Sequence, residues 1–252
     1  MTRTAIIAAM PGELKPLTRG WQHTHSKGVD LWSADDCIAA CAGAGVSAAA
    51  RAFAEVEKLG SVDQVISTGW AGALRAELIP GQAYWVAGVL DARTGERFET
   101  ADVLSHPSRK NKDAARVGHP GVDESPISQN REMGHPGLWL ATSATVAGKA
   151  EKQRLASTTP ASLVDMEAAA IARLAAARGI PFFCIKGISD GYIDQLPDFN
   201  RFISSDGRFH LARFVLFVLP RPCYWSALIR MGENSKKASC AIAASLFDLL
   251  GL

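Results

Sequence analysis

Short apolar runs alternate with longer amphipathic stretches along most of the chain. This alternation is typical of a mostly parallel sheet whose strands are joined by crossover helices, so we expect an α/β fold. Two helices are expected, at 46–59 and 166–178, with Gly60 and Gly179 as their stop signals. The expected strands cover residues 4–10, 37–42, 62–68, 82–92, 138–143, 161–164 and 182–188.

Two segments depart from this alternation. Residues 99–137 are rich in Ser, Pro, Gly, Asn and charged residues without apolar periodicity, so we expect a long surface loop or arm. From Pro220 onward apolar residues recur at helical spacing in two groups on either side of Gly232, which predicts packing helices. We therefore expect a single domain over residues 1–252, with an arm at about 99–137 and extra C-terminal helices from about 220.

Composition narrows the classes of function. The 252 residues are 48% hydrophobic, which is enough to bury a substantial core. A net charge of only +2, from 27 basic and 25 acidic residues, gives no large field to attract nucleic acid. Five cysteines lack metal-site spacing, six histidines lack a helical metal motif, and no apolar run reaches membrane-spanning length. We expect a cytoplasmic protein that binds no metal and no nucleic acid and has no integral membrane segment.

A glycine-rich turn follows the second expected strand and allows two interpretations. The segment Gly43–Ala48 fits the loose GxGxxA form of a dinucleotide fingerprint. That fingerprint also needs an acid at the end of the next strand, but this strand ends Ile66–Thr68 and its only acid, Asp63, lies at its start. A tight structural turn is therefore favoured over a nucleotide cofactor, and an NAD(P) oxidoreductase ranks well below an enzyme built on acidic residues.

Three acidic residues, Glu13, Glu167 and Asp190, come directly after expected strands. Taken singly, they fit a turn acid, a helix-dipole partner and an N-cap. Taken together, they suit a site in which one carboxylate activates a nucleophile, one accepts sugar hydroxyls and one protonates a leaving group. That division favours cleavage of a glycosidic bond, and a nucleoside in particular, because its base leaves once a ring nitrogen is protonated.

Four short motifs, Ala8–Glu13, Ser67–Gly72, Val164–Ala168 and Ile188–Asp190, stand in the order found in one known superfamily. Over about residues 4–190 the chain resembles the purine nucleoside phosphorylases and methylthioadenosine/S-adenosylhomocysteine nucleosidases. The resemblance implies a three-layer α/β/α fold with a central mixed, partly barrel-like sheet. It also implies a homo-oligomer with no metal or organic cofactor, in which inorganic phosphate is a possible co-substrate.

The resemblance further implies roles for individual residues. Glu13 matches the acid that positions or activates water, and Asp190 matches the general acid at purine N7, oriented by Ser189. Glu167 matches the acid that binds the ribose hydroxyls, with Met166 packing under the sugar. The other implied substrate-binding residues are Gly69, Trp70, Ala71, Gly72, Val146 and Lys186.

Three departures from the family pattern bear on the reaction. Bacterial-type phosphorylases hold phosphate with an arginine three residues before a serine, and here these positions are Ser67 and Trp70. Loss of bidentate arginine recognition favours hydrolysis, or a phosphate held by Lys186 and backbone amides. Trp70 either narrows the pocket or stacks on the ligand, and Thr145 replaces a purine-stacking phenylalanine.

We therefore expect cleavage of the N-ribosidic bond of an adenine-type nucleoside with a modified 5′ group, by hydrolysis or phosphorolysis. Tail motifs between residues 196 and 235 also resemble the hopanoid-associated phosphorylase branch, which implies removal of adenine from an adenosyl-hopanoid as an alternative. A second alternative is a non-catalytic nucleoside-binding member of the same fold, motivated by Trp70 and the missing arginine.

Overall fold

Strand β12 (Phe182–Asp190) is the longest strand of the computed structural model, which describes residues 2–103 and 137–252. All nine of its residues are buried. It pairs in parallel with β5 (Gln64–Ser67) and β6 (Trp70–Ala73) and antiparallel with β7 (Ala83–Trp85). Because β12 has neighbours along its whole length, it joins the two halves of the sheet and carries its last residue, Asp190, to their junction.

The described strands form one mixed, twelve-stranded sheet, in the order β2-β3-β4-β1-β5-β12-β6-β11-β10-β8-β9, with β7 paired to β12. The pairs β1–β4, β1–β5, β5–β12, β6–β12, β8–β10 and β10–β11 are parallel. The pairs β2–β3, β3–β4, β6–β11, β7–β12 and β8–β9 are antiparallel. The remaining strands are β1 (Thr4–Ala8), β2 (Gln22–Ser26), β3 (Val29–Ala34), β4 (Cys37–Cys41), β8 (Gly88–Asp91), β9 (Arg97–Glu99), β10 (Trp139–Thr142) and β11 (Leu163–Asp165).

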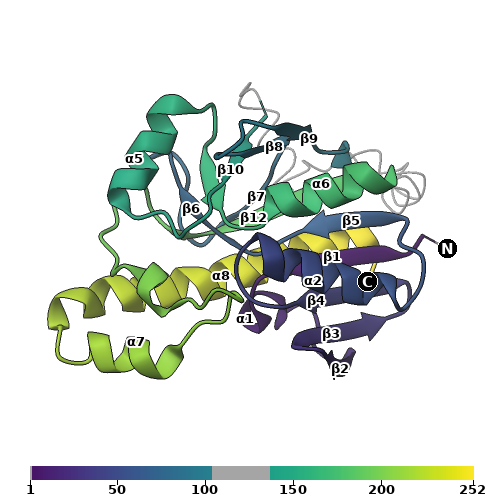
Figure 1. Cartoon of the computed structure of the whole chain (residues 1–252), viewed down its shortest axis with the longest axis horizontal. Helices are drawn as coiled ribbons and strands as arrows, with labels where there is room; N and C mark the ends of the chain where they lie inside the picture. Colours follow the sequence, from purple (N-terminus) through teal and green to yellow (C-terminus); the bar gives the residue numbers. More distant parts are fainter. Residues whose placement is uncertain (1, 104–136) are drawn as a thin grey trace, which may run out of the picture.

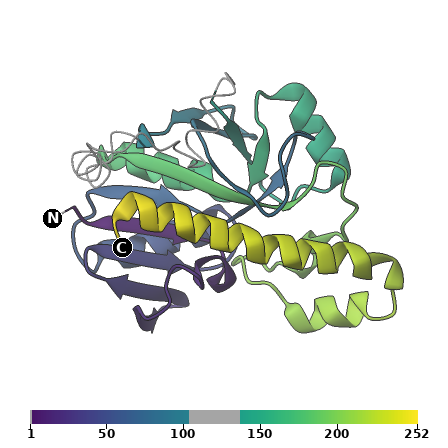
Figure 2. The same cartoon turned by 180° about the vertical axis from the view of Figure 1, so that it is seen from behind.

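Helices cover both faces of this sheet (Figure 1). On one face α2 (Val46–Glu57) and α6 (Ala168–Arg178) pack together and bury alanine-rich surfaces. On the other face the long α8 (Trp225–Leu250) lies along β12, as Figure 2 shows from behind. The expected three-layer α/β/α fold with a central mixed sheet is therefore confirmed. The shorter helices are α1 (Pro11–Leu14), α5 (Lys149–Thr158), η2 (Phe199–Phe202), α7 (Leu211–Val218) and η3 (Pro222–Tyr224).

Several elements differ from the expectations. The expected strand 82–92 is two strands, β7 and β8, because the chain leaves β12 after Trp85 and pairs with β10 from Gly88. Four strands, β2, β3, β6 and β9, were not expected. Strand β2, for example, is mostly exposed and has no apolar run. Helix α8 continues through Gly232 without a break, and helical structure begins at Leu211 rather than near 220.

The C-terminal helix divides into a buried half and an exposed half. Ala238, Ile242, Leu246 and Leu249 are buried, as the helical spacing indicates. Trp225, by contrast, is 46% exposed, so the expectation that it packs is wrong. Within the described residues, no helix is long and apolar enough to cross a membrane. Most of the expected polar arm, residues 104–136, lies outside the described residues.

Candidate active site

A cavity of about 310 Å³ opens where β1, β6, β11 and β12 end or bend. Acidic side chains from three separate parts of the chain meet in its wall, namely Glu13, Glu167 and Asp190. Of the eleven residues predicted for the site, nine line this cavity; the other two, Gly69 and Lys186, lie behind its wall. The nine are Glu13, Trp70, Ala71, Gly72, Val146, Met166, Glu167, Ser189 and Asp190.

Glu13 is held by backbone amides in the short helix α1, which begins at Pro11 directly after β1. Its Oε2 accepts hydrogen bonds from the amides of Ala9 at 2.8 Å and Met10 at 2.7 Å. Its Oε1 accepts one from the amide of Trp70 at 2.7 Å. Burial raises the pKa of the Glu13 carboxyl, and these three hydrogen bonds oppose the rise. The result is a fixed carboxylate of increased basicity.

Gly69 lies behind the cavity wall, and its backbone approaches the Glu13 carboxyl group closely. Its φ is +120°, in the region that favours glycine, and a Cβ there would lie 2.7 Å from Glu13 Oε1. Only glycine therefore lets the turn between β5 and β6 approach Glu13 this closely.

Glu167 precedes α6 and reaches across to the glycine-rich turn. Its Oε1 accepts a hydrogen bond of 2.6 Å from the Gly45 amide at the start of α2. This amide therefore binds a protein carboxylate, in agreement with the structural-turn interpretation of Gly43–Ala48. Burial and the nearby charge of Asp165 raise the pKa of Glu167 to about 8.

Lys186 lies below the cavity and is 1% exposed. Its Nζ is 2.9 Å from Asp165 Oδ2 and donates a 2.9 Å hydrogen bond to the carbonyl of Thr68. Although burial opposes it, the Asp165 charge holds the pKa of Lys186 above its ordinary value. The structure thus gives Lys186 a buried ion-pair partner, and the lysine is absent from the lining of the cavity.

Asp190 forms an ion pair with a lysine that the sequence analysis missed. Its Oδ2 contacts Lys152 Nζ from α5, and its Oδ1 accepts a 2.6 Å hydrogen bond from Ser189. Lys152 also donates to the carbonyl of Gly191 at 2.7 Å, and its side chain is only 3% exposed. One sequence signal was available, since Lys152 is three positions before Leu155, the other buried residue of α5.

Trp70 forms part of the cavity wall next to α8. Its indole Nε1 donates to Ser239 Oγ at 2.8 Å and to the carbonyl of Ser235 at 3.1 Å. The ring is therefore tied to α8, and a cavity remains beside it.

Val146 presents both of its backbone polar groups to Asn200 of η2. The Val146 amide donates to Asn200 Oδ1 at 2.8 Å, and Asn200 Nδ2 donates to the Val146 carbonyl at 3.0 Å. We call this pair of hydrogen bonds the Asn200 clasp. The adjoining wall is apolar and consists of Phe199, Ile203, Phe209 and Met231.

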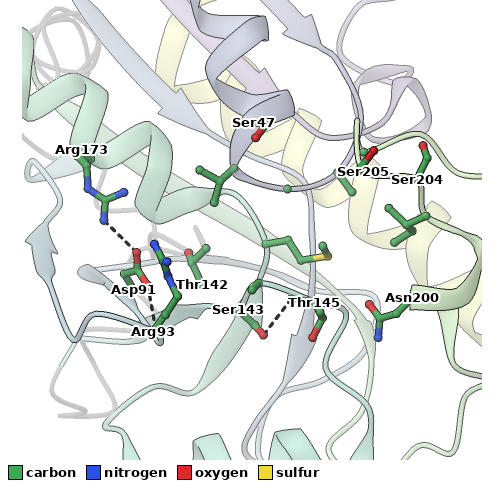
Figure 3. A pocket seen from close by; sticks show the side chains of 17 residues that line it. Ser47, Asp91, Arg93, Thr142, Ser143, Thr145, Arg173, Asn200, Ser204 and Ser205 are labelled. Atoms are coloured by element: carbon green, nitrogen blue, oxygen red, sulfur yellow. Dashed lines mark hydrogen bonds and ion pairs between the residues drawn. The ribbon is translucent and has the colours of Figure 1, made fainter.

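A second, more polar cavity of about 500 Å³ shares Ala44, Met166 and Ile203 with the first. Figure 3 shows its polar side chains, with Asp91 between Arg173 and the backbone of Arg93. Asp91 Oδ2 is 2.9 Å from Arg173 and Oδ1 accepts a 3.0 Å hydrogen bond from the Arg93 amide. Among the residues that the structure describes, no three His, Cys, Asp or Glu side chains form a group that could hold a metal ion.

Comparison with protein families accounts for this arrangement of strands and acids. The model of the phosphorylase superfamily matches residues 3–208, which is most of the chain and includes all eleven predicted site residues. The chain belongs to the phosphorylase superfamily. This membership confirms the expected enzyme class, cleavage of N-glycosidic bonds. No curated protein matches the chain in sequence.

Solved structures of this superfamily share the fold over the whole chain. A mutant of Helicobacter pylori MTAN with 5′-methylthioadenosine in its active site aligns with a TM-score of 0.67 and 16% identity, covering 100% of this chain and 99% of the other. The Streptococcus pneumoniae MTA/SAH nucleosidase with 8-aminoadenine gives 0.65 and 21%, covering 99% of both chains. The futalosine hydrolase of H. pylori gives 0.65 and 16%, covering 99% and 97%. At these identities the likeness establishes the fold.

Proposed function

We propose that this superfamily member hydrolyses the N-ribosidic bond of an adenine-type nucleoside with a modified 5′ group and releases the free base. The observation that carries the proposal is the meeting of Glu13, Glu167 and Asp190 in one cavity. Nucleosidases among the similar structures act on such nucleosides, which supports the choice of substrate class.

Each acid has a distinct task in the proposed reaction. As the bond between the ribose C1′ and the base N9 breaks, its electron pair goes to the base, which accepts a proton at N7 from the Asp190–Lys152 pair. Water held by Glu13 adds its oxygen to C1′ and gives a proton to this carboxylate, whose raised pKa suits it to the role of base. Glu167 binds the ribose hydroxyls.

The cations at the site favour hydrolysis over phosphorolysis. Among the residues that the structure describes, Lys152 is the only lysine or arginine in the lining of the acid-lined cavity, and it is bound to Asp190 and the Gly191 carbonyl. Lys186 lies behind the cavity wall and forms an ion pair with Asp165. A bound phosphate dianion would therefore face four acidic side chains, Glu13, Asp165, Glu167 and Asp190, with no arginine in the described lining to hold it.

The Asn200 clasp supports adenine as the base. The carboxamide of Asn200 offers an acceptor to the Val146 amide and a donor to its carbonyl. The ring nitrogen N1 and the exocyclic amino group of adenine offer the same pair of groups. We therefore expect adenine to replace Asn200 at Val146 when substrate binds.

The second cavity provides room for the 5′ substituent beside Met166. A nucleoside with an apolar 5′ substituent, such as an adenosyl-hopanoid, is a second candidate for the substrate. It is favoured by Phe199, Ile203 and Phe209 in the wall of the acid-lined cavity. Comparing S-adenosylhomocysteine with an adenosine that carries a long 5′ alkyl group separates the two. Faster turnover of the alkyl compound would favour the second candidate.

The proposal is tested by incubating the protein with adenosine, methylthioadenosine, S-adenosylhomocysteine and inosine and measuring free base. We expect base from at least one 5′-modified adenine nucleoside and little from inosine. If every compound binds and none is cleaved, the non-catalytic alternative replaces the proposal.

A further inference from the structure

A helical hairpin extends beyond the sheet at one end of the molecule, as both views show (Figures 1 and 2). It consists of α7, η3 and α8 as far as Met231, and we call it the α7–α8 hairpin. No residue of α7 is buried among the described residues. Of the eleven exposed large hydrophobic side chains among residues 2–103 and 137–252, six lie on the hairpin: Leu211, Val215, Leu216, Leu219, Trp225 and Ile229.

The hairpin has an aromatic inner side and an aliphatic outer side. Phe214 stacks on Phe199 with ring centroids 5.2 Å apart and contacts Phe202 at 5.3 Å, which fixes α7 to η2. The outer side carries Leu216, which is 72% exposed, and Leu219, which is 63% exposed. Clusters of this kind mark binding surfaces, because water-exposed apolar area is otherwise kept scattered.

The charge of the hairpin has a single sign. Residues 207–232 contain four arginines, Arg208, Arg213, Arg221 and Arg230, and no aspartate or glutamate. Arg208 pairs with Asp206 at 3.2 Å. The other three are exposed and have no acidic partner within the described part of the chain. A partner surface that complements the hairpin is therefore both apolar and anionic.

We propose that the α7–α8 hairpin docks on the surface of an anionic lipid bilayer. Leu216, Leu219 and Ile229 would enter the boundary between headgroups and acyl chains, and the arginines would contact lipid phosphates. The amphipathic ring of Trp225, 46% exposed, suits the same interface. With eight residues, α7 spans roughly 12 Å, so the hairpin lies on the bilayer and does not cross it.

A second copy of this chain fits the same surface less well. In a symmetric dimer the patch would face its own copy, so two surfaces of the same positive charge would be brought together. Residues 207–232 supply no acid to pair with them. Charge therefore favours a membrane over self-association through the hairpin.

The hairpin adjoins the acid-lined cavity. Phe199 and Phe209 line the cavity, and both contact Phe214 of α7. If the proposed function holds, a docked enzyme would take a nucleoside whose apolar 5′ group is anchored in the bilayer. This consequence rests on the proposed function, whereas docking itself does not.

Vesicle flotation of the full chain without nucleoside tests docking separately from catalysis. We expect the protein to float with phosphatidylcholine vesicles that contain phosphatidylglycerol and to float much less with phosphatidylcholine alone. The double variant Arg213→Glu/Arg230→Glu should weaken binding by about tenfold or more. The triple variant Leu216→Gln/Leu219→Gln/Ile229→Gln should abolish it.

Matched variants on other elements serve as controls. Lys149→Glu/Arg19→Glu changes the same net charge, and Leu59→Gln/Ile79→Gln removes exposed apolar side chains elsewhere. Both should float like the unmodified protein. Equal flotation of control and hairpin variants would overturn the proposal. So would absence of flotation combined with a dimer, seen by light scattering, that the triple variant converts to a monomer.

Discussion

At the scale of single residues, the site depends on how each acid is partnered. Glu13 accepts only backbone amides, Glu167 accepts an amide near the charge of Asp165, and Asp190 has a buried lysine. The same type of side chain therefore has different partners at three points of one cavity, and burial raises the pKa of Glu13 and of Glu167. This is how a protein obtains a base and an acid from carboxyl groups at one pH.

The Asp190–Lys152 pair predicts two different responses to substitution. Asp190→Asn should lower kcat by roughly 10²- to 10⁴-fold at every pH, because the group that faces the base is lost. In Lys152→Met, Asp190 has to take its proton from solvent, so the remaining activity should rise as pH falls. Rates of base release measured from pH 5 to 9 check both.

A neighbouring lysine provides the control for this experiment. Lys149 lies on the same helix and is exposed, so Lys149→Met should keep the unmodified pH profile. An unchanged rate in Asp190→Asn, or a Lys152→Met profile parallel to that of the unmodified enzyme, would contradict the role of the pair.

Glu167 predicts how stability depends on pH. Its pKa is about 8 in the folded chain against an ordinary 4.5, so the protonated form is favoured by folding. Its contribution to stability is complete below about pH 4.5 and is lost as pH rises through about 8. From pH 5.5 to 8.5 the Tm of the unmodified protein should fall more than that of Glu167→Gln, by on the order of 5 °C.

Glu99→Gln, at an exposed carboxyl group on β9, is the control and should follow the unmodified protein. Thermal unfolding at the two pH values measures the difference. If Glu167→Gln follows the unmodified protein as well, the raised pKa is refuted.

At the scale of elements, short connections between the strands and the helices bring the site together. Helix α5 places Lys152 in contact with Asp190, and η2 places Asn200 in contact with Val146. Both elements follow strands of the sheet, so they close the cavity from the side on which those strands end. The site therefore depends on α5 and η2 keeping their positions.

The Asn200 clasp predicts that the Asn200 side chain competes with the substrate base for the backbone polar groups of Val146. Asn200→Ala frees both polar groups of Val146 for the base, so KM should fall by roughly 3- to 10-fold while kcat stays unchanged. Arg201→Ala, on the same turn but exposed, should leave KM as it is. A higher KM in Asn200→Ala would mean that Asn200 itself binds the substrate.

The sequence predicts buried elements well and exposed ones poorly. Strand β12 and the buried half of α8 carry strong apolar patterns, and the acids placed after such strands line one cavity. Strand β2 lacks an apolar face, so periodicity has no signal there. Lys152 was missed because a lysine on a polar helix is normally solvated, and its burial depends on a contact 38 residues away.

At the scale of the whole molecule, the sheet and the hairpin contribute different features to the site. The sheet holds the acids, and the α7–α8 hairpin gives the cavity an apolar and basic neighbour. The expected homo-oligomer stays a prediction, and its arrangement would have to leave the hairpin free if the hairpin docks on membranes.

The central claim is hydrolysis of the N-ribosidic bond, and the release of adenine from methylthioadenosine tests it most directly. The rate is measured in phosphate-free buffer and again with millimolar phosphate, and the sugar product is analysed in both. The account predicts equal rates and free methylthioribose in each case. Strict dependence on phosphate with a sugar 1-phosphate as product, or no adenine from any 5′-modified adenosine, would contradict it.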